Sequence, residues 1–278
     1  MGSRPNPRPV AWANNITGEG IVVGIIDTGV NGGHVALNQS FAGVWMDPYF
    51  NRSGPSDPHD HGTLVAGIIM GRANGVGVEP GAKYVACAGL NSQGSGIEYM
   101  LIRCAQYLIT ETPRPYVINN AWGGPLADAT CLPGRISAEL CNSTYSPGNQ
   151  ADVISVGATS EIDAVLLNSD RGPSPDGLLK PELSAPGSNI VSCWYGYDNY
   201  RTTTDVTLAS AHVTRAVALI LSAHPTWTFD DILDALITSA VHPTLSNEDR
   251  ICGLPGPGDY PNYSFDHGRI DVAAALGL

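Results

Sequence analysis

Apolar residues along the chain fall into short runs that are separated by glycine and polar turns. The run at residues 20–26 is continuously apolar and bounded by glycine, which predicts a strand buried on both faces of a parallel sheet. Asp27 ends this strand, at the sheet edge where open α/β folds place their ligands and their chemistry. Similar runs predict further strands at residues 83–88, 116–120, 152–158 and 190–193.

Longer apolar stretches with helical spacing lie between these strands. Residues 61–70 and 208–223 predict buried helices, and residues 95–109 predict an amphipathic helix. Residues 229–240 predict another helix, with Thr228 as its N-cap. Strands that alternate with helices indicate a three-layer α/β fold with a mostly parallel central sheet and helices on both faces. No linker or repeat divides the chain, so we expect one domain over residues 1–278.

The composition supports a buried core and argues against two classes of partner. Hydrophobic residues make up 43 % of the 278 residues and charged residues 14 %, which is typical of a globular domain. The formal net charge of −12 argues against nucleic acid, because phosphate binding needs clustered Lys and Arg. No apolar run reaches the roughly 18 residues of a membrane span, so we expect no membrane partner. The sequence leaves the oligomeric state open.

The six cysteines give information on metal binding and on the cellular location of the protein. None belongs to a CxxC pair, and the histidines lack partners at metal-ligand spacing, so we expect no metal and no cofactor. Cys131 and Cys141 bracket a short loop and are candidates for a disulfide bond. Cysteine usage and five Asn-x-Ser/Thr sequons favour a secreted protein or one of the secretory pathway, with the cytoplasm as the alternative.

Three segments carry the candidate chemistry, and their order is informative. Asp27 opens an Asp-Thr-Gly sequence, His61 opens a His-Gly-Thr sequence, and Thr207 directly precedes the helix predicted at 208–223. Asp, then His, then a hydroxyl residue is one of three unrelated chain orders in which the catalytic triad of hydrolases is known. The order predicts that Asp27 and His61 lie within hydrogen-bond reach.

Six blocks of the sequence, in order, resemble the subtilisin-like, or subtilase, family over essentially the whole chain. The blocks lie at residues 25–30, 60–67, 90–96, 117–124, 171–187 and 268–274. The resemblance implies a subtilisin-like fold of the three-layer α/β class. It also implies a serine-hydrolase triad made of Asp27, His61 and the residue at position 207.

The sequence departs from the family at the nucleophile. Where a subtilisin-like enzyme has Gly-Thr-Ser-Met, this chain has Asp205-Val206-Thr207-Leu208. Thr207 keeps a hydroxyl that can attack a carbonyl, but its methyl group stiffens χ1 and occupies space beside the attacking oxygen. Asp205 replaces a glycine that allows close approach of backbone and substrate, and its carboxylate would repel a developing oxyanion.

The resemblance also assigns a substrate cleft. Gly94 and Gly96 lie in a segment similar to the loop that lines the cleft, and Asn119 and Trp122 lie in a segment similar to the strand that pairs with a bound peptide. Trp122 stands where the family keeps a small or aliphatic residue, so its ring either fills the pocket beside it or stacks on a flat substrate.

A further departure concerns the oxyanion donor. Residues 125–152 form a short segment where the family has a surface helix, a buried strand and a turn whose Asn side chain donates to the oxyanion. Asn142 is the candidate for a displaced donor. Loss of such a donor costs about 2.7–4 kcal/mol of transition-state stabilisation, so we expect weak or absent activity on ordinary peptides.

Three classes of function fit these residues. The first is a hydrolase or acyl-transfer enzyme with Thr207 as nucleophile, His61 as base and Asp27 as orienting group. The second is an enzyme that uses the Asp27–His61 pair as a general base on a small molecule, in a biosynthetic role. The third is an inactive pseudoprotease that binds a peptide as an added strand. The substrate is accordingly a peptide or a small molecule.

Overall fold

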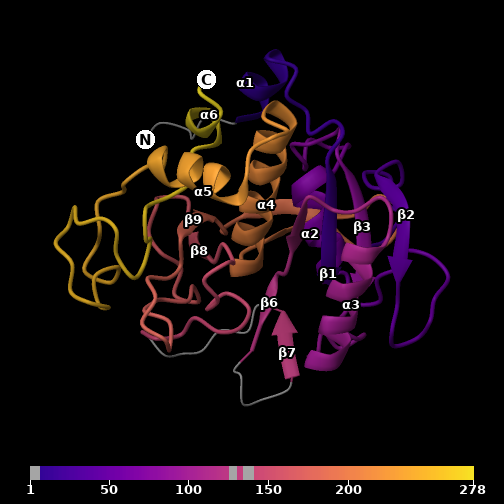
Figure 1. Ribbon diagram of the computed structural model, residues 1–278, viewed down its shortest axis with the longest axis horizontal. Coiled ribbons are helices and arrows are strands. Elements are labelled where there is room, and N and C mark those ends of the chain that lie inside the picture. The colour runs from indigo at the N-terminus through magenta and orange to yellow at the C-terminus, as the bar shows by residue number, and fades with distance from the viewer. Residues whose placement is uncertain (1–6, 125–129, 134–140) are drawn as a thin grey trace.

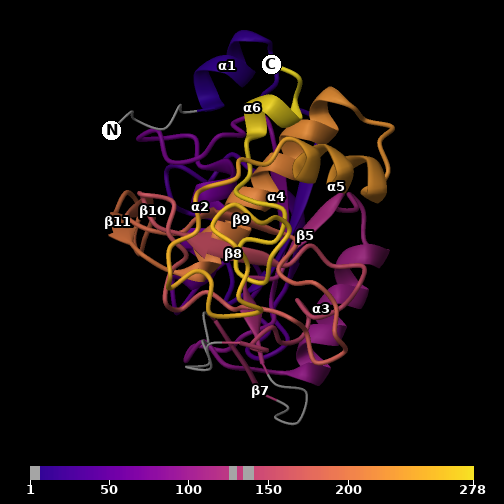
Figure 2. The ribbon, with the colours of Figure 1, turned by 90° about the vertical axis from the view of Figure 1, so that its left-hand side faces the viewer.

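The centre of the molecule is a four-stranded parallel sheet with the strand order β2-β3-β1-β5. Its strands are Phe41–Met46 (β2), Lys83–Ala88 (β3), Val22–Asp27 (β1) and Val117–Asn119 (β5). The computed structural model describes residues 7–124, 130–133 and 141–278 (Figures 1 and 2). Three of these strands lie at the predicted positions. β2 was not predicted, because it is a half-buried edge strand whose apolar run is interrupted by Gly43.

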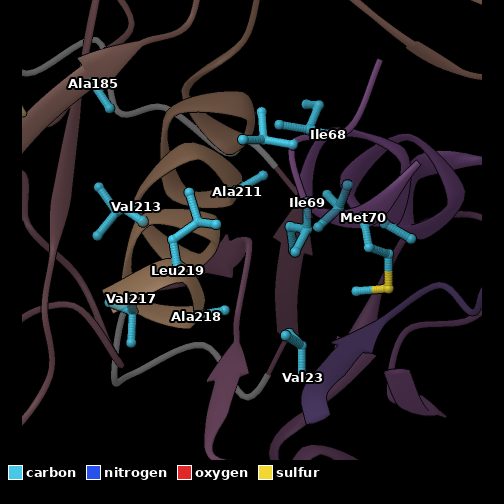
Figure 3. Packing of buried hydrophobic residues seen from close by; sticks show 14 of the residues in the cluster. Val23, Ile68, Ile69, Met70, Ala185, Ala211, Val213, Val217, Ala218 and Leu219 are labelled. Carbon is cyan, nitrogen blue, oxygen red and sulfur yellow. The ribbon is translucent and has the colours of Figure 1, made fainter. Parts of the chain in front are cut away.

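Helices cover both faces of this sheet. α2 (His61–Met70) and α4 (Val206–Ala223) pack against each other and against one face, and α3 (Glu98–Thr110) covers the other. Side chains along β1 point alternately to the two faces of the sheet. Val23 and Ile25 pack in the core with α2 and α4, whereas Ile26 packs in the core with α3. Figure 3 shows Ile68, Ile69 and Met70 of α2 packed beside the small residues Ala211 and Ala218 of α4.

The remaining predicted strands form small separate sheets. β8 (Val156–Thr159) pairs in parallel with β9 (Leu183–Pro186), and β10 (Ile190–Cys193) forms an antiparallel pair with β11 (Tyr200–Thr203). The run at 152–158 therefore becomes a strand only in its second half. A third sheet, in the order β4-β7-β6, contains Gly96–Ile97 (β4), Thr130–Pro133 (β7) and Trp122–Gly123 (β6).

Three more helices lie towards the chain ends: α1 (Pro7–Ala13), α5 (Phe229–Thr238) and α6 (Val272–Ala275). Thr228 caps α5 as predicted, in a capping box with Asp231. α4 is long and apolar enough by length and composition to cross a membrane, but 72 % of it is buried inside the molecule, which is typical of a core helix.

Two disulfide bonds tie distant segments together. Cys87 of β3 is bonded to Cys104 of α3, and Cys141 is bonded to Cys252, 111 residues further along the chain. The predicted Cys131–Cys141 bond is therefore wrong, because Cys141 is paired with a residue that only the tertiary fold brings near.

The long-range disulfide gives a stability prediction. Replacing both cysteines in Cys141→Ala/Cys252→Ala releases a loop of more than one hundred residues in the unfolded chain. The free energy of unfolding in urea should then fall by about 2–4 kcal/mol, because the unfolded ensemble regains entropy. An unchanged urea midpoint for the double variant would contradict this assignment.

Candidate active site

The site begins where β1 ends and α2 starts. Asp27, the last residue of β1, is fully buried, and one of its carboxylate oxygens accepts the Thr28 N–H at 2.6 Å. The same oxygen lies 2.8 Å from Nδ1 of His61, the first residue of α2. The two side chains predicted to meet from their order in the sequence therefore lie at hydrogen-bond distance.

A glycine makes this contact possible. A Cβ atom on Gly62 would lie 2.0 Å from the Gly29 carbonyl oxygen and 3.0 Å from the Asp27 Cβ, so no side chain fits there. Gly29 has a φ of +125°, which glycine adopts readily, and a Cβ on it would meet the Ser56 carbonyl oxygen at 2.1 Å. The N-terminus of α2 is thus held directly against the end of β1.

Asp57, which was not predicted to belong to the site, organises the same junction. Its Oδ2 accepts both the N–H (2.8 Å) and the hydroxyl (2.7 Å) of Thr63 in the first turn of α2. Its Oδ1 accepts the Thr28 hydroxyl at 2.8 Å and the N–H groups of His59 and Asp60. Asp is a residue type whose side chain accepts main-chain N–H groups shortly after it in the chain, and this is the signal that could have indicated the turn.

The third member of the site comes from the start of α4. Thr207 is 4 % exposed, and its hydroxyl oxygen lies 3.2 Å from Nε2 of His61. Since the Asp27 carboxylate can only accept, the His61 Nδ1 carries the proton towards it and Nε2 is left free to accept from the hydroxyl. Asp27, His61 and Thr207 therefore form one continuous line of hydrogen bonds.

Asp205 caps α4 and changes the electrostatics of the site. Its carboxylate accepts the Thr207 N–H at 3.1 Å. Burial opposes the positive charge on His61, but the carboxylates of Asp27, Asp205 and Asp57 outweigh burial and raise its pKa above the ordinary value. The cap occupies the N–H next to the hydroxyl, which is a group that could otherwise stabilise a developing oxyanion.

Asn142 does not join this group. Its side chain is exposed, its backbone N–H donates to the Gly172 carbonyl at 3.3 Å, and it follows the disulfide-bonded Cys141. It is not among the residues that line the cavity next to Thr207. The geometry therefore gives no support to Asn142 as a displaced oxyanion donor.

The edges predicted to bind a peptide already pair with a segment of the chain itself. β7 lies between them in antiparallel register, with Gly96 opposite Cys131 and Gly123 opposite Leu132. Gly94, with a φ of +72°, shapes the turn that leads into β4. A peptide that used both edges would have to displace β7.

The two other predicted cleft residues are anchored in the protein. The indole N–H of Trp122 donates to the Ile26 carbonyl at 2.7 Å, and the ring packs against the core cluster shared with α3. Asn119 is 2 % exposed, and its amide nitrogen donates to the hydroxyls of Ser210 (2.9 Å) and Thr214 (2.8 Å). Asn119 thus ties β5 to α4, a positioning role that the sequence did not indicate.

Comparison with known proteins agrees with this geometry. The sequence model of the subtilase family matches residues 18–254. The chain belongs to the subtilase family. Bacillopeptidase F of Bacillus subtilis (strain 168) is 27 % identical over 314 residues, which cover 96 % of this subtilase and 21 % of that protein. Subtilisin E of the same organism is 30 % identical over 252 residues, covering 84 % of this chain and 64 % of its own.

A third relative, alkaline serine exoprotease A of Vibrio alginolyticus, is 32 % identical over 247 residues, covering 82 % of this chain and 43 % of its own. This subtilase chain thus spans less than two thirds of the length of each of the three relatives. Family membership confirms the α/β fold class predicted from the sequence and gives the chain a hydrolase architecture of the serine-protease type.

The position of Asp205 leads to a prediction on the titration of His61. Asp205→Asn keeps an oxygen that can cap α4 but removes a negative charge that favours the imidazolium, so the pKa of His61 should fall. His61 would then become neutral at lower pH, which NMR titration of its ring protons measures directly. The exposed Asp176→Asn serves as the control and should leave the titration unchanged. Equal pKa values in Asp205→Asn and the parent would contradict the effect.

Proposed function

We propose that this subtilase is a hydrolase that forms an acyl-enzyme on Thr207. His61 is the general base, and Asp27 orients it and stabilises its imidazolium. The observation that carries the proposal is the unbroken line of contacts, 2.8 Å from Asp27 to His61 and 3.2 Å from His61 to Thr207. Nucleophile and base at hydrogen-bond distance, with a third group that orients the base, is the arrangement needed for covalent catalysis.

The reaction follows from the positions of these atoms. The Thr207 hydroxyl passes its proton to Nε2 of His61 as its oxygen bonds to the substrate carbonyl carbon, and the carbonyl electron pair moves onto oxygen. When this intermediate collapses, the C–N bond breaks and His61 returns the proton to the leaving amine. Water then attacks the acyl ester with His61 as base, and the proton ends on the Thr207 oxygen as the carboxylic acid departs.

Two features support weak activity on ordinary peptides. The Asp205 carboxylate occupies the Thr207 N–H and adds negative charge where an oxyanion would form. β7 pairs with both β4 and β6, the strands along which we expect a peptide substrate to bind. Two disulfide bonds also support an oxidising location, either outside the cell or in the secretory pathway.

A second candidate function is favoured by one observation. A cavity of about 530 Å3 lies beside Thr207, within the size range of small-molecule sites. In this alternative, His61 acts as a general base on a small molecule, and the Thr207 hydroxyl forms no covalent bond.

Substitutions at Thr207 separate the two functions. Under the acyl-enzyme mechanism, Thr207→Ser keeps the hydroxyl and removes the crowding methyl, so hydrolysis of activated esters should be retained or increased. Thr207→Ala and His61→Ala should each lower kcat by about 100-fold or more, since either loss removes the activated nucleophile. Full ester hydrolysis in Thr207→Ala with loss in His61→Ala would favour the second function. Insensitivity to both changes would indicate an inactive pseudoprotease.

The role of the cap can be tested separately. Asp205→Gly releases the Thr207 N–H for an oxyanion and costs only a few tenths of a kcal/mol in helix capping. Asp205→Asn removes the charge but keeps a capping oxygen. If the occupied N–H limits catalysis, kcat for ester hydrolysis should rise by about 10-fold or more in Asp205→Gly and much less in Asp205→Asn. An equal rise in kcat over the parent in both variants would show that the Asp205 charge, and not occupancy of the Thr207 N–H, limits catalysis.

A further inference from the structure

The cavity beside Thr207 extends well beyond the catalytic atoms and separates two of the sheets. It has a volume of about 530 Å3 and is lined on one side by residues 116–123, including β5, and on the other by residues 152–156, which lead into β8. Within the described part of the chain, β5 pairs with β1 and β8 pairs with β9. Among these residues the outer edge of β5 joins no sheet, and the outer edge of β8 is free only at its start, since Thr159 forms a bridge to Val165. We call this cavity the β5–β8 slot.

The free main-chain groups of both strands point into the slot. The Tyr116 N–H donates to Val22 of β1, so the alternation of a strand turns the main-chain groups of Val117 and Asn119 the other way, towards the slot. On the other side, the Ala158 N–H donates to Ser169 and its carbonyl accepts the Leu166 N–H, so its main-chain groups face away from β9 and are already bonded. By the same alternation, the main-chain groups of Val156 also face away from β9.

One face of α4 spans the slot from end to end. The lining residues of α4 follow helical spacing, and they are Val206, Thr207, Ser210, Val213, Thr214, Val217 and Leu221. In Figure 3, Val213 and Val217 project from the side of α4 that faces away from α2. α4 also packs on both β5 and β8, so this face, which is mixed apolar and hydroxyl in character, forms a continuous floor between the two strands.

Three residues that line the slot each carry a buried side-chain oxygen that has no hydrogen-bond partner among the described residues. These oxygens are the Asn119 Oδ1, the Thr144 Oγ1 and the Asp170 Oδ1. The Asn119 and Thr144 side chains are each 2 % exposed. Burial raises the pKa of Asp170 to about 7, against the opposing effects of a hydrogen bond with Ser143 and of the nearby Arg171 charge. Each of these oxygens is buried from solvent and leaves an unused acceptor in the wall of the slot, which is costly.

We propose that the β5–β8 slot binds an extended apolar segment of another polypeptide, which adds as a strand between β5 and β8. A strand is the occupant that can bond to two free edges at once while its side chains rest on the α4 floor. The charged residues that line the slot are Asp152 and Asp170, and the chain carries a net charge of −12, so the segment carries no acidic residues. This goes beyond hydrolysis at Thr207 and does not depend on it.

The test uses the His61→Ala variant, in which a bound peptide cannot be cleaved through the proposed mechanism. The probe is the peptide Val-Thr-Val-Lys-Val, acetylated at its N-terminus and amidated at its C-terminus. Its control is the same peptide with N-methyl groups on alternate residues, which removes N–H donors and keeps the side chains. Calorimetry should detect binding of the first peptide alone, and hydrogen exchange should slow at residues 117–120 and 153–156.

A slot-filling variant gives an independent readout. Val217→Phe places a larger apolar side chain on the α4 floor, and peptide affinity should fall at least about tenfold, or 1.4 kcal/mol. Val213→Leu serves the same purpose if Val217→Phe does not fold. The matched control is Ile102→Phe on the exposed surface of α3, which should bind normally.

Two outcomes overturn the proposal. Equal binding of the N-methylated peptide, or unchanged affinity in a folded slot-filling variant, means that no strand adds in the slot. Protection from exchange at residues 96–97 and 122–123 alone places the peptide in the catalytic cleft instead. Because His61 is absent, neither outcome bears on Thr207, and failure of Thr207 to react leaves slot binding unaffected.

Discussion

The site depends on the direct contact between the N-terminus of α2 and the end of β1. Gly62 allows it, since any side chain there would overlap the Gly29 carbonyl and the Asp27 side chain. Asp57 fixes the contact by accepting hydrogen bonds from the loop after β1 and from the first turn of α2. The separation of Asp27 and His61 is thereby set by backbone packing, which positions the pair more firmly than flexible side chains could.

α4 connects the candidate active site to the rest of the molecule. Its first turn carries Thr207 and is capped by Asp205, so the residue that stabilises the helix start also occupies the N–H beside the nucleophile. Asn119 anchors the same helix to β5. In the proposed mechanism this arrangement keeps Asp27, His61 and Thr207 in line at some cost in oxyanion stabilisation, so we expect slow chemistry.

Local sequence patterns were sufficient to predict the buried strands and helices, and the order of the motifs was sufficient to predict the contact between Asp27 and His61. Continuous apolar runs identified β1 and β3, because strands buried on both faces have little alternative to that composition. The patterns did not reveal the Cys141–Cys252 bond, the pairing of β7 with β4 and β6, or the outer edge of β5, which joins no sheet in the described part of the chain. These features join segments far apart in the chain, and no local periodicity encodes which edge remains unpaired.

The central claim is that Asp27 and His61 activate the Thr207 hydroxyl for covalent chemistry. Labelling of the protein with a fluorophosphonate, followed by intact-mass measurement and peptide mapping, tests it most directly. Such a probe bonds to an activated hydroxyl through phosphorus as fluoride leaves. The account predicts one adduct, at Thr207, that forms slowly and is absent in His61→Ala. No adduct on the folded protein, or equal labelling in His61→Ala, would contradict it.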